Sequence, residues 1–367
     1  MIDKLYLLYN IHYTMKTPEI SVIIPAYNAQ DTIIKCLDSI MYQDGAPDFE
    51  IIVINDGSTD NTGKIVQEYC YNRPNIQLAN MLQNRGISVA RNNGMCLAKG
   101  RYITFVDADD MVGVANDALR KLMTGLRLER NKITPMQIDC ISYPDADNFV
   151  PPLCTTYFTN LLRVARPDTN IVLGGKLGLD VRLNIMALCS YNTPYEFDLS
   201  PSDKTRALHN AYMRESANFA LYERKFLEKR RLKFQPRMPL DEDILFCMQT
   251  VLHAKSIITA PDVTYMYVRH DNSASTPKDY WPSYNLSAIQ LFSVFLNDMY
   301  KYPEYRDIFY HWLTEFKFIG SLAQTQQTRF PNAICGKCEP NTTKCFSCKK
   351  LSKHLNFIIQ NFVSLSK

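Results

Sequence analysis

Apolar and polar positions change in a regular order along the first hundred residues. Short apolar runs, the length of buried strands, lie at 21–24, 51–54, 76–78 and 102–106. Between them, apolar residues recur at helical spacing over 31–41, 61–71 and 86–98. Strands that alternate with helices predict an α/β fold, a mostly parallel sheet flanked by helices with right-handed crossovers.

The pattern is weaker in the rest of the chain. It predicts helices at 119–128, 221–232 and 244–252, a strand at 265–268, and a helical C-terminal region over 284–325. The prolines between 135 and 152 predict a loop-rich stretch.

Composition narrows the class of protein. Hydrophobic residues make up 46% of the 367-residue chain, enough for a sizeable core, and the formal net charge is +4. That charge is too small to indicate a nucleic-acid partner, although it is compatible with an anionic substrate or with peripheral contact at the inner face of the plasma membrane. We see neither the roughly 18 apolar residues of a spanning helix nor a signal-peptide cleavage site. With 11 cysteines, an odd number, we expect a cytoplasmic protein.

Three carboxylates follow the predicted strand at 102–106, namely Asp107, Asp109 and Asp110. Crowded carboxylates repel one another, and a bound cation relieves that repulsion. Mg²⁺ and Mn²⁺ prefer such oxygen ligands and are commonly held by one or two carboxylates plus substrate phosphates. In an extended chain Asp107 and Asp109 point the same way, with Ala108 opposite. The alternative is a solvated acidic loop.

Two further positions carry candidate chemistry. Asp56 directly follows the strand at 51–54 and has the hydrogen-bonding capacity to bind a base or ribose, although Asp56-Gly57 is also a tight-turn signal. Arg91 lies on a predicted helix of small residues. Its guanidinium is suited to a phosphate or to the acids at 107–110, and the alternative is an ordinary ion pair.

Taken together, these segments resemble family 2 glycosyltransferases and their GT-A domain, which binds nucleotide-diphosphate sugars. The matching stretches are SVIIPAYNAQDTIIKCLDSI, EIIVINDGSTDNT and NRGISVARNNGMCLAKGRYITFVDADD. They occupy about residues 20–111, in the family's order and spacing. The similarity continues more weakly at 219–246 and 265–276, whereas residues 112–215 carry no motif that we can place.

The resemblance implies roles for the nucleotide-binding residues. Asp56 resembles the acid that reads the base, which we expect to be uracil, and Arg91 resembles an arginine near the diphosphate. Asp107 resembles the first acid of an Asp-x-Asp motif, which contacts ribose or metal. The turn that lines the nucleotide would consist of Pro25, Ala26, Tyr27 and Asn28.

The resemblance also implies the metal ligands. Asp109 would bind Mn²⁺ or Mg²⁺ directly, with Asp110 beside it and Ala108 between Asp107 and Asp109. His270 resembles a basic position that some members bring to the diphosphate or metal. The alternative for His270 is an ordinary loop residue.

A catalytic base is expected near the start of the predicted helix at 244–252. Inverting transfer needs a group that takes the proton of the acceptor hydroxyl. The stretch LDEDILF is similar to the family's Glu-Asp motif, so Asp243 matches the base and Glu242 its neighbour. Adjacent acids raise one another's pKa. The alternatives are acids that merely cap the helix, or Asp241 in place of Asp243.

Four cysteines near the C-terminus form a C-x₂-C-x₆-C-x₂-C pattern: Cys335, Cys338, Cys345 and Cys348. Two such pairs are suited to holding a structural Zn²⁺ tetrahedrally in a small zinc knuckle, with no open position for catalysis. Unliganded thiols are the alternative.

The resulting expectation is a metal-dependent, inverting glycosyltransferase of bacterial surface polysaccharide or glycolipid assembly. It would use a nucleotide-diphosphate sugar donor, with UDP as the nucleotide, and a glycan or lipid-linked acceptor. A non-catalytic nucleotide-binding or scaffold protein on the same fold is the alternative. The expected organisation is an N-terminal extension (1–17, with translation starting at Met1 or Met15), a GT-A domain (18–276, divided at 111/112), a helical region (277–330) and a four-cysteine tail (331–367).

Overall fold

A computed structural model describes the part of the chain that carries the predicted sheet and its helices. It covers residues 17–43, 45, 47–113, 129–133, 136–142, 156–180, 185–191, 193–200, 216–238 and 242–269. The predicted helix at 119–128, the helical region beyond 277 and the four-cysteine tail lie outside the described residues.

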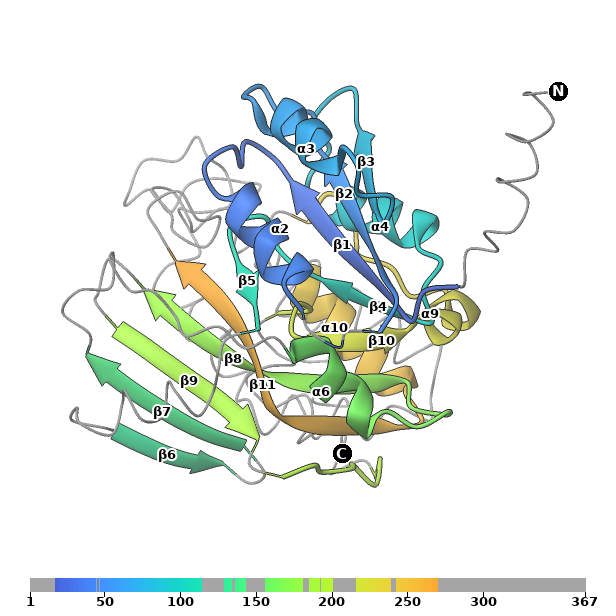
Figure 1. The fold of residues 1–367 in the computed structure, drawn as a ribbon. Helices are drawn as coiled ribbons and strands as arrows, with labels where there is room; N and C mark the ends of the chain where they lie inside the picture. The colour runs from blue at the N-terminus through green and yellow to red at the C-terminus, as the bar shows by residue number, and fades with distance from the viewer. Residues whose placement is uncertain are drawn as a thin grey trace, which may run out of the picture.

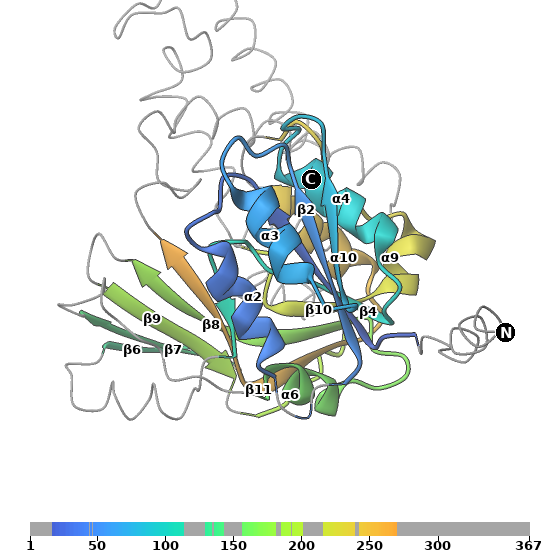
Figure 2. The same cartoon turned by 45° about the horizontal axis from the view of Figure 1, so that its top comes forward.

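The N-terminal half is a parallel sheet, as its pattern predicts. Its four strands lie in the order β3-β2-β1-β4: β1 (Ile20–Ala26), β2 (Phe49–Asn55), β3 (Ile76–Asn80) and β4 (Tyr102–Phe105). Two helices, α2 (Ile33–Met41) and α3 (Thr62–Cys70), cover one face (Figures 1 and 2). A right-handed return from β3 to β4 places α4 (Ile87–Leu97) on the other face. There Gly94 permits close packing, since a Cβ at this position would lie 2.3 Å from Cγ2 of Ile23.

The sheet continues beyond β4 with antiparallel pairs. β4 pairs with β10 (Ala220–Glu223), and β10 pairs with β8 (Ile171–Asp180). Next come β9 (Ile185–Tyr191), β7 (Met136–Ser142) and β6 (Glu129–Ile133), while β11 (Ile257–Arg269) runs parallel to β8 and pairs with the short β5 (Met111–Val112). Figure 1 shows the resulting curved sheet. The expectation of a mostly parallel sheet is therefore wrong beyond β4, where the sheet is mixed.

Three more helices belong to this half: α6 (Tyr157–Val164), α9 (Arg224–Arg230) and α10 (Glu242–His253). A buried aromatic cluster fixes α10 against β4. Phe246 of α10 stacks on Phe234, with ring centroids 4.1 Å apart, and meets Phe105 of β4 edge-on at 5.8 Å. Such aromatic pairs contribute beyond the burial of their area. They hold the first turn of α10 beside the end of β4.

The local pattern misplaced some boundaries. Residues 136–142 form β7, although their neighbouring prolines predicted a loop. The predicted helix at 221–232 is a short strand, β10, followed by α9. Both errors have one cause, because these segments take their conformation from pairing with distant strands rather than from local periodicity.

The first strand continues past the predicted range of 21–24 and includes Pro25, because β1 runs to Ala26. Pairing between β1 and β4 stops at Ile23, whose carbonyl accepts the Val106 N–H, whereas pairing with β2 continues to Ala26. The backbone of Pro25 faces the side on which β4 has already ended. Its missing N–H therefore removes no hydrogen bond from the sheet.

Among the described helices, none combines the length and the apolar character that a membrane-spanning segment requires.

Candidate active site

The polar segments predicted to carry the chemistry meet at the carboxyl ends of β1, β2 and β4. Parallel strands end at the same edge of a sheet, and ligands of open α/β sheets bind beyond that edge. Asn28, Asp56 and Asp107 follow these three strands within two residues.

The segments after β1 and β2 are tied to each other. Asn28 adopts a left-handed φ of 50°; its N–H donates to Ser58 Oγ at 3.0 Å, and its side-chain oxygen accepts the Thr59 N–H at 2.9 Å. Pro25 and Ala26 are buried within β1, whereas the side chain of Tyr27 is 48% exposed. Of the four residues predicted to line a nucleotide, only Tyr27 and Asn28 therefore offer side chains at this surface.

Asp56 is almost fully buried and forms hydrogen bonds to the backbone of the loop at residues 85–86. Its two oxygens accept the N–H groups of Arg85 at 2.9 Å and Gly86 at 2.8 Å. Gly57 has a φ of 68°, and a Cβ there would lie 2.5 Å from the backbone nitrogen of Asn84. The tight turn and the buried carboxylate are therefore both present. A nucleotide base that bonded to Asp56 would use the lone pairs that do not accept the N–H groups of residues 85 and 86.

Arg91 links two acidic segments that are far apart in sequence. Its Nη2 donates to Asp107 Oδ1 at 2.9 Å, and its Nη1 donates to Glu242 Oε1 at 3.0 Å. Burial alone lowers the pKa of Arg91, but the carboxylates of Asp107 and Glu242 outweigh it and raise that pKa, so the guanidinium stays charged.

The predicted contact between Arg91 and a diphosphate does not fit this geometry. The side chain is only 2% exposed, and both terminal nitrogens already bond to carboxylates. The alternative of an ion pair with the 107–110 acids holds instead.

Asp107 is held from a second direction by residues of the C-terminal half. Asn218 Nδ2 donates to Asp107 Oδ2 at 2.8 Å, and the Tyr265 hydroxyl accepts the Asp107 N–H at 3.2 Å. With Arg91 on Oδ1, each oxygen of Asp107 is fixed in direction. Its side chain nevertheless remains 22% exposed, so the carboxylate has a fixed orientation and is still accessible to a ligand.

The other two acids of the motif differ in direction. Asp110 is 1% exposed and turns inward, with Oδ2 accepting the Tyr265 hydroxyl at 2.5 Å and Oδ1 the Val268 N–H at 2.9 Å. Burial raises the pKa of Asp110 well above its usual range, and the charges of Asp109 and Asp107 add to this. Its predicted role as a metal ligand is thus not supported, because both of its carboxylate oxygens accept hydrogen bonds from residues of β11. Asp109 is half-buried, and Ala108 is buried.

The Glu-Asp motif begins α10, as expected. Glu242 is 8% exposed and accepts from Arg91, whereas Asp243 is half-buried and accepts the Ile244 N–H at 2.9 Å. Both lie in the first helical turn, where the helix dipole stabilises negative charge. Glu242 therefore has a structural partner, and Asp243 is the more accessible of the two acids.

Several predicted site residues are not placed. His270, Asp241 and the four cysteines Cys335, Cys338, Cys345 and Cys348 lie outside the described residues. Within the described ranges, no group of three or more His, Cys, Asp or Glu side chains forms a complete metal site from protein ligands alone.

Residues 21–184 match the family model described as glycosyl transferase family 2. These residues therefore carry a domain of glycosyl transferase family 2. Over 96 residues, or 26% of the chain, it is 49% identical to the uncharacterized glycosyltransferase YibD of Escherichia coli K12, and covers 27% of that protein. Over 252 residues, 68% of the chain, it is 27% identical to the poly(ribitol-phosphate) beta-glucosyltransferase of Bacillus spizizenii, and covers 32% of that protein.

A solved structure supports the fold of this domain. A mannosyltransferase from Pyrobaculum calidifontis, in complex with GDP-Man and Mn²⁺, aligns with a TM-score of 0.50 at 15% identity, over 96% of this chain and 84% of that one. The chain spans less than a third of the length of each of the two relatives above. These comparisons give the family and the fold, whereas substrates and partners belong to the proposal below.

Asn218 and Tyr265 are residues of the candidate site that the sequence did not indicate. The Tyr265 hydroxyl joins three groups: the Asp107 N–H, Asp110 Oδ2 and Asn218 Nδ2, the last at 3.0 Å. Burial, with the nearby charge of Asp110, raises the pKa of Tyr265 well above its usual range, so it stays a hydroxyl donor. The alternation at 265–268 predicted the strand but gave no signal for this role.

We expect Tyr265→Phe to lower the free energy of unfolding by about 1–3 kcal/mol, because it leaves buried groups of Asp107 and Asp110 without their hydrogen-bond partner. Urea unfolding measures this. Tyr71→Phe, at a side chain that is 77% exposed, is the matched control and should change little. Equal stability of both variants would contradict the role given to Tyr265.

Proposed function

We propose that this chain transfers a sugar from a UDP-sugar to an acceptor hydroxyl, with inversion, in the assembly of bacterial surface polysaccharide or glycolipid. One observation carries the proposal. A single buried guanidinium, that of Arg91, bonds both to Asp107 at the end of β4 and to Glu242 in the first turn of α10. Arg91 thereby holds the acidic segment after β4, where the sugar donor is proposed to bind, next to the segment that carries the candidate base.

Asp243 is the proposed base, and Glu242 positions it. Glu242 is fixed by Arg91, so the first turn of α10 cannot rotate freely, and the neighbouring Asp243 keeps an accessible carboxylate. It accepts the proton of the acceptor hydroxyl as the oxygen attacks the anomeric carbon. The bond from that carbon to the nucleotide diphosphate breaks, and the diphosphate leaves with its electron pair.

The nucleotide is proposed to lie beyond β1 and β2. Asn28 and Ser58 form a fixed rim there, and the exposed ring of Tyr27 offers a surface for a base. Asp56 would read uracil with the lone pairs not used by the 85–86 backbone. The choice of UDP over other nucleotides rests on the sequence resemblance.

The residues present fit a divalent cation held jointly with substrate. Hard cations at diphosphates commonly take one or two protein carboxylates and fill their other positions with phosphate and water. Asp109 would hold Mn²⁺ or Mg²⁺, and the partly exposed Asp107 is its neighbour. When bound, the metal stabilises the negative charge of the leaving diphosphate. Asp110 takes no part in binding it, because its oxygens bond to Tyr265 and Val268.

We also propose that the transferase domain spans residues 18–276, beyond the 21–184 matched by the family model. The supporting observation is continuity of the sheet, since β11 pairs with β8 and β5 as far as Arg269. Residues 112–276 would form the acceptor half. The extension, the helical region and the zinc-binding tail remain proposals from sequence.

Nucleotide release from a panel of UDP- and GDP-sugars tests the function. We expect slow hydrolysis of a UDP-sugar with Mn²⁺, loss of this activity in EDTA, and recovery with excess Mn²⁺. Turnover that persists in EDTA would refute the role of Asp109. A non-catalytic scaffold predicts no turnover, and a thermal shift with UDP and Mn²⁺ then shows whether nucleotide binds at all.

A further inference from the structure

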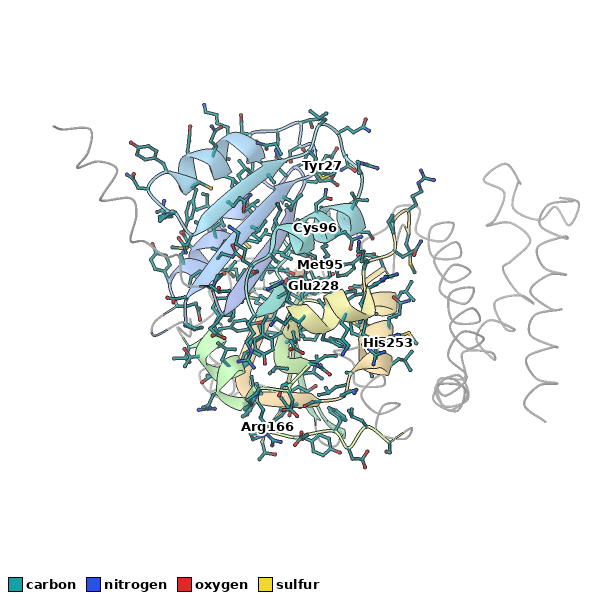
Figure 3. All side chains as sticks on the ribbon, turned by 90° about the vertical axis from the view of Figure 1, so that its right-hand side faces the viewer. Tyr27, Met95, Cys96, Arg166, Glu228 and His253 are labelled. Atoms are coloured by element: carbon teal, nitrogen blue, oxygen red, sulfur yellow. The ribbon has the colours of Figure 1, made fainter. Side chains whose placement is uncertain are left out.

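A basic cavity of about 570 Å³ lies among α4, α9, the segment after α9, and α10. Figure 3 views this side of the molecule, with Cys96 of α4, Glu228 of α9 and His253 of α10 labelled. The cavity is lined by Asn92, Lys229, Arg230, Arg231, Leu232, Lys233, Phe234, Gln235, Pro236, Gln249 and His253. None of the acids assigned above to the transfer reaction is among these residues.

The lining is cationic without compensating acids. Lys229, Arg230, Arg231 and Lys233 are all exposed, and no lining residue is Asp or Glu. The nearby acid Glu228 accepts from Arg224 at 2.6 Å. None of the four cations forms a salt bridge with any residue in the described part of the chain.

Helix stability explains only part of this cluster. Lys229 and Arg230 lie in the last turn of α9, where the helix dipole favours cations. Lys233 lies beyond that turn. Arg231 caps the helix with a left-handed φ of 55°, a conformation that glycine adopts with less strain. Arginine is unfavourable there for the backbone, which points to a use for its side chain.

The floor of the cavity is preformed. The side chain of Asn92 donates to the Phe234 carbonyl at 2.8 Å and accepts the Phe234 N–H at 3.0 Å. The Phe234 ring in turn stacks on Phe246. The backbone next to the cations is therefore already held in place. This reduces the conformational entropy that is lost when a ligand binds.

We propose that this cavity is a second anion site, which binds a phosphate group other than that of the sugar donor. Lysine and arginine clusters pair with phosphate through charge-assisted hydrogen bonds. The donor site is placed beyond the carboxyl ends of β1, β2 and β4. None of the residues that line the cavity belongs to the segments that follow these three strands. The phosphate belongs either to a soluble phosphorylated glycan or to the head group of an anionic lipid.

Tripolyphosphate, titrated calorimetrically into the full chain in EDTA, tests the site without the metal-dependent donor site. We expect the triple variant Lys229→Gln/Arg231→Gln/Lys233→Gln to bind about tenfold more weakly or worse. Lys35→Gln/Lys64→Gln/Lys99→Gln removes the same charge from exposed positions outside the cavity and should keep wild-type affinity. Arg231→Gly should weaken binding while preserving stability, because glycine suits the left-handed φ.

Flotation with phosphatidylcholine vesicles, with and without phosphatidylglycerol, distinguishes the two sources. Binding that needs phosphatidylglycerol and the cavity cations assigns the phosphate to a lipid, whereas tripolyphosphate binding alone assigns it to a soluble ligand. The thermal shift with UDP and Mn²⁺ should persist in the triple variant, so failure here is separate from failure of the transferase proposal. Equal tripolyphosphate affinities of wild type and both triple variants, or no binding of either probe, would overturn the site.

Discussion

Asp243→Asn is expected to lower the rate of sugar transfer by roughly 10²–10⁴-fold, the usual contribution of general acid–base catalysis. The amide keeps the size of the side chain but accepts no proton from the acceptor hydroxyl. UDP binding in the presence of Mn²⁺ should stay near wild type, because Asp243 is not among the residues placed against the nucleotide. Steady-state kinetics and calorimetry separate these two effects.

The matched control for Asp243 is Asp168→Asn, at an exposed turn between α6 and β8. It should leave both the rate and UDP binding unchanged. If Asp243→Asn abolished UDP binding, its role would be structural, and if it left the rate intact, the base would lie elsewhere.

Arg91→Met is expected to lower the free energy of unfolding by about 3–5 kcal/mol, because removing one partner of a buried ion pair leaves the others uncompensated. Asp107 and Glu242 would then face each other without the cation between them. Transfer activity should be lost as well, since the two motifs lose their shared anchor. Arg101→Met is the control, because Arg101 is 42% exposed, with Glu19 at 3.9 Å, and such pairs contribute only about 0–1 kcal/mol.

A second substitution tests the cause of that instability. Arg91→Met combined with Glu242→Gln removes one uncompensated charge, so the double variant should be more stable than the sum of the two single effects predicts. Strict additivity in urea unfolding would show that Arg91 contributes by packing on Phe234, whose ring centroid lies 5.0 Å from the guanidinium, rather than by pairing.

The N-terminal half was predictable because its signals are local. The apolar runs of β1 to β4 and the helical spacing of α2 to α4 are each set within about a dozen residues. The same holds for the polar segments at strand ends, which is why Asp56 and Asp107 were expected directly after two predicted strands.

What the sequence did not reveal depends on contacts between distant segments. No local pattern shows that Asp110 turns inward to Tyr265 and Val268, since two adjacent acids look alike in a sequence. Asn218 lies just before the weakly similar stretch at 219–246, and its bond to Asp107 spans 111 residues. The strand at 136–142 likewise exists through its pairing with β9.

The long sequence separation between Arg91 and Glu242 has a consequence for folding during synthesis. Its bond to Glu242 closes a loop of 151 residues. Contacts between residues so far apart in sequence form only after long stretches of chain have become ordered. Closing a long loop costs conformational entropy before the new contacts can contribute stabilising free energy. When β1 to β4 have left the ribosome but α10 has not, the guanidinium of Arg91 lacks one of its two carboxylate partners. The nascent N-terminal half therefore stays incomplete, and the proposed active site can form only late in synthesis.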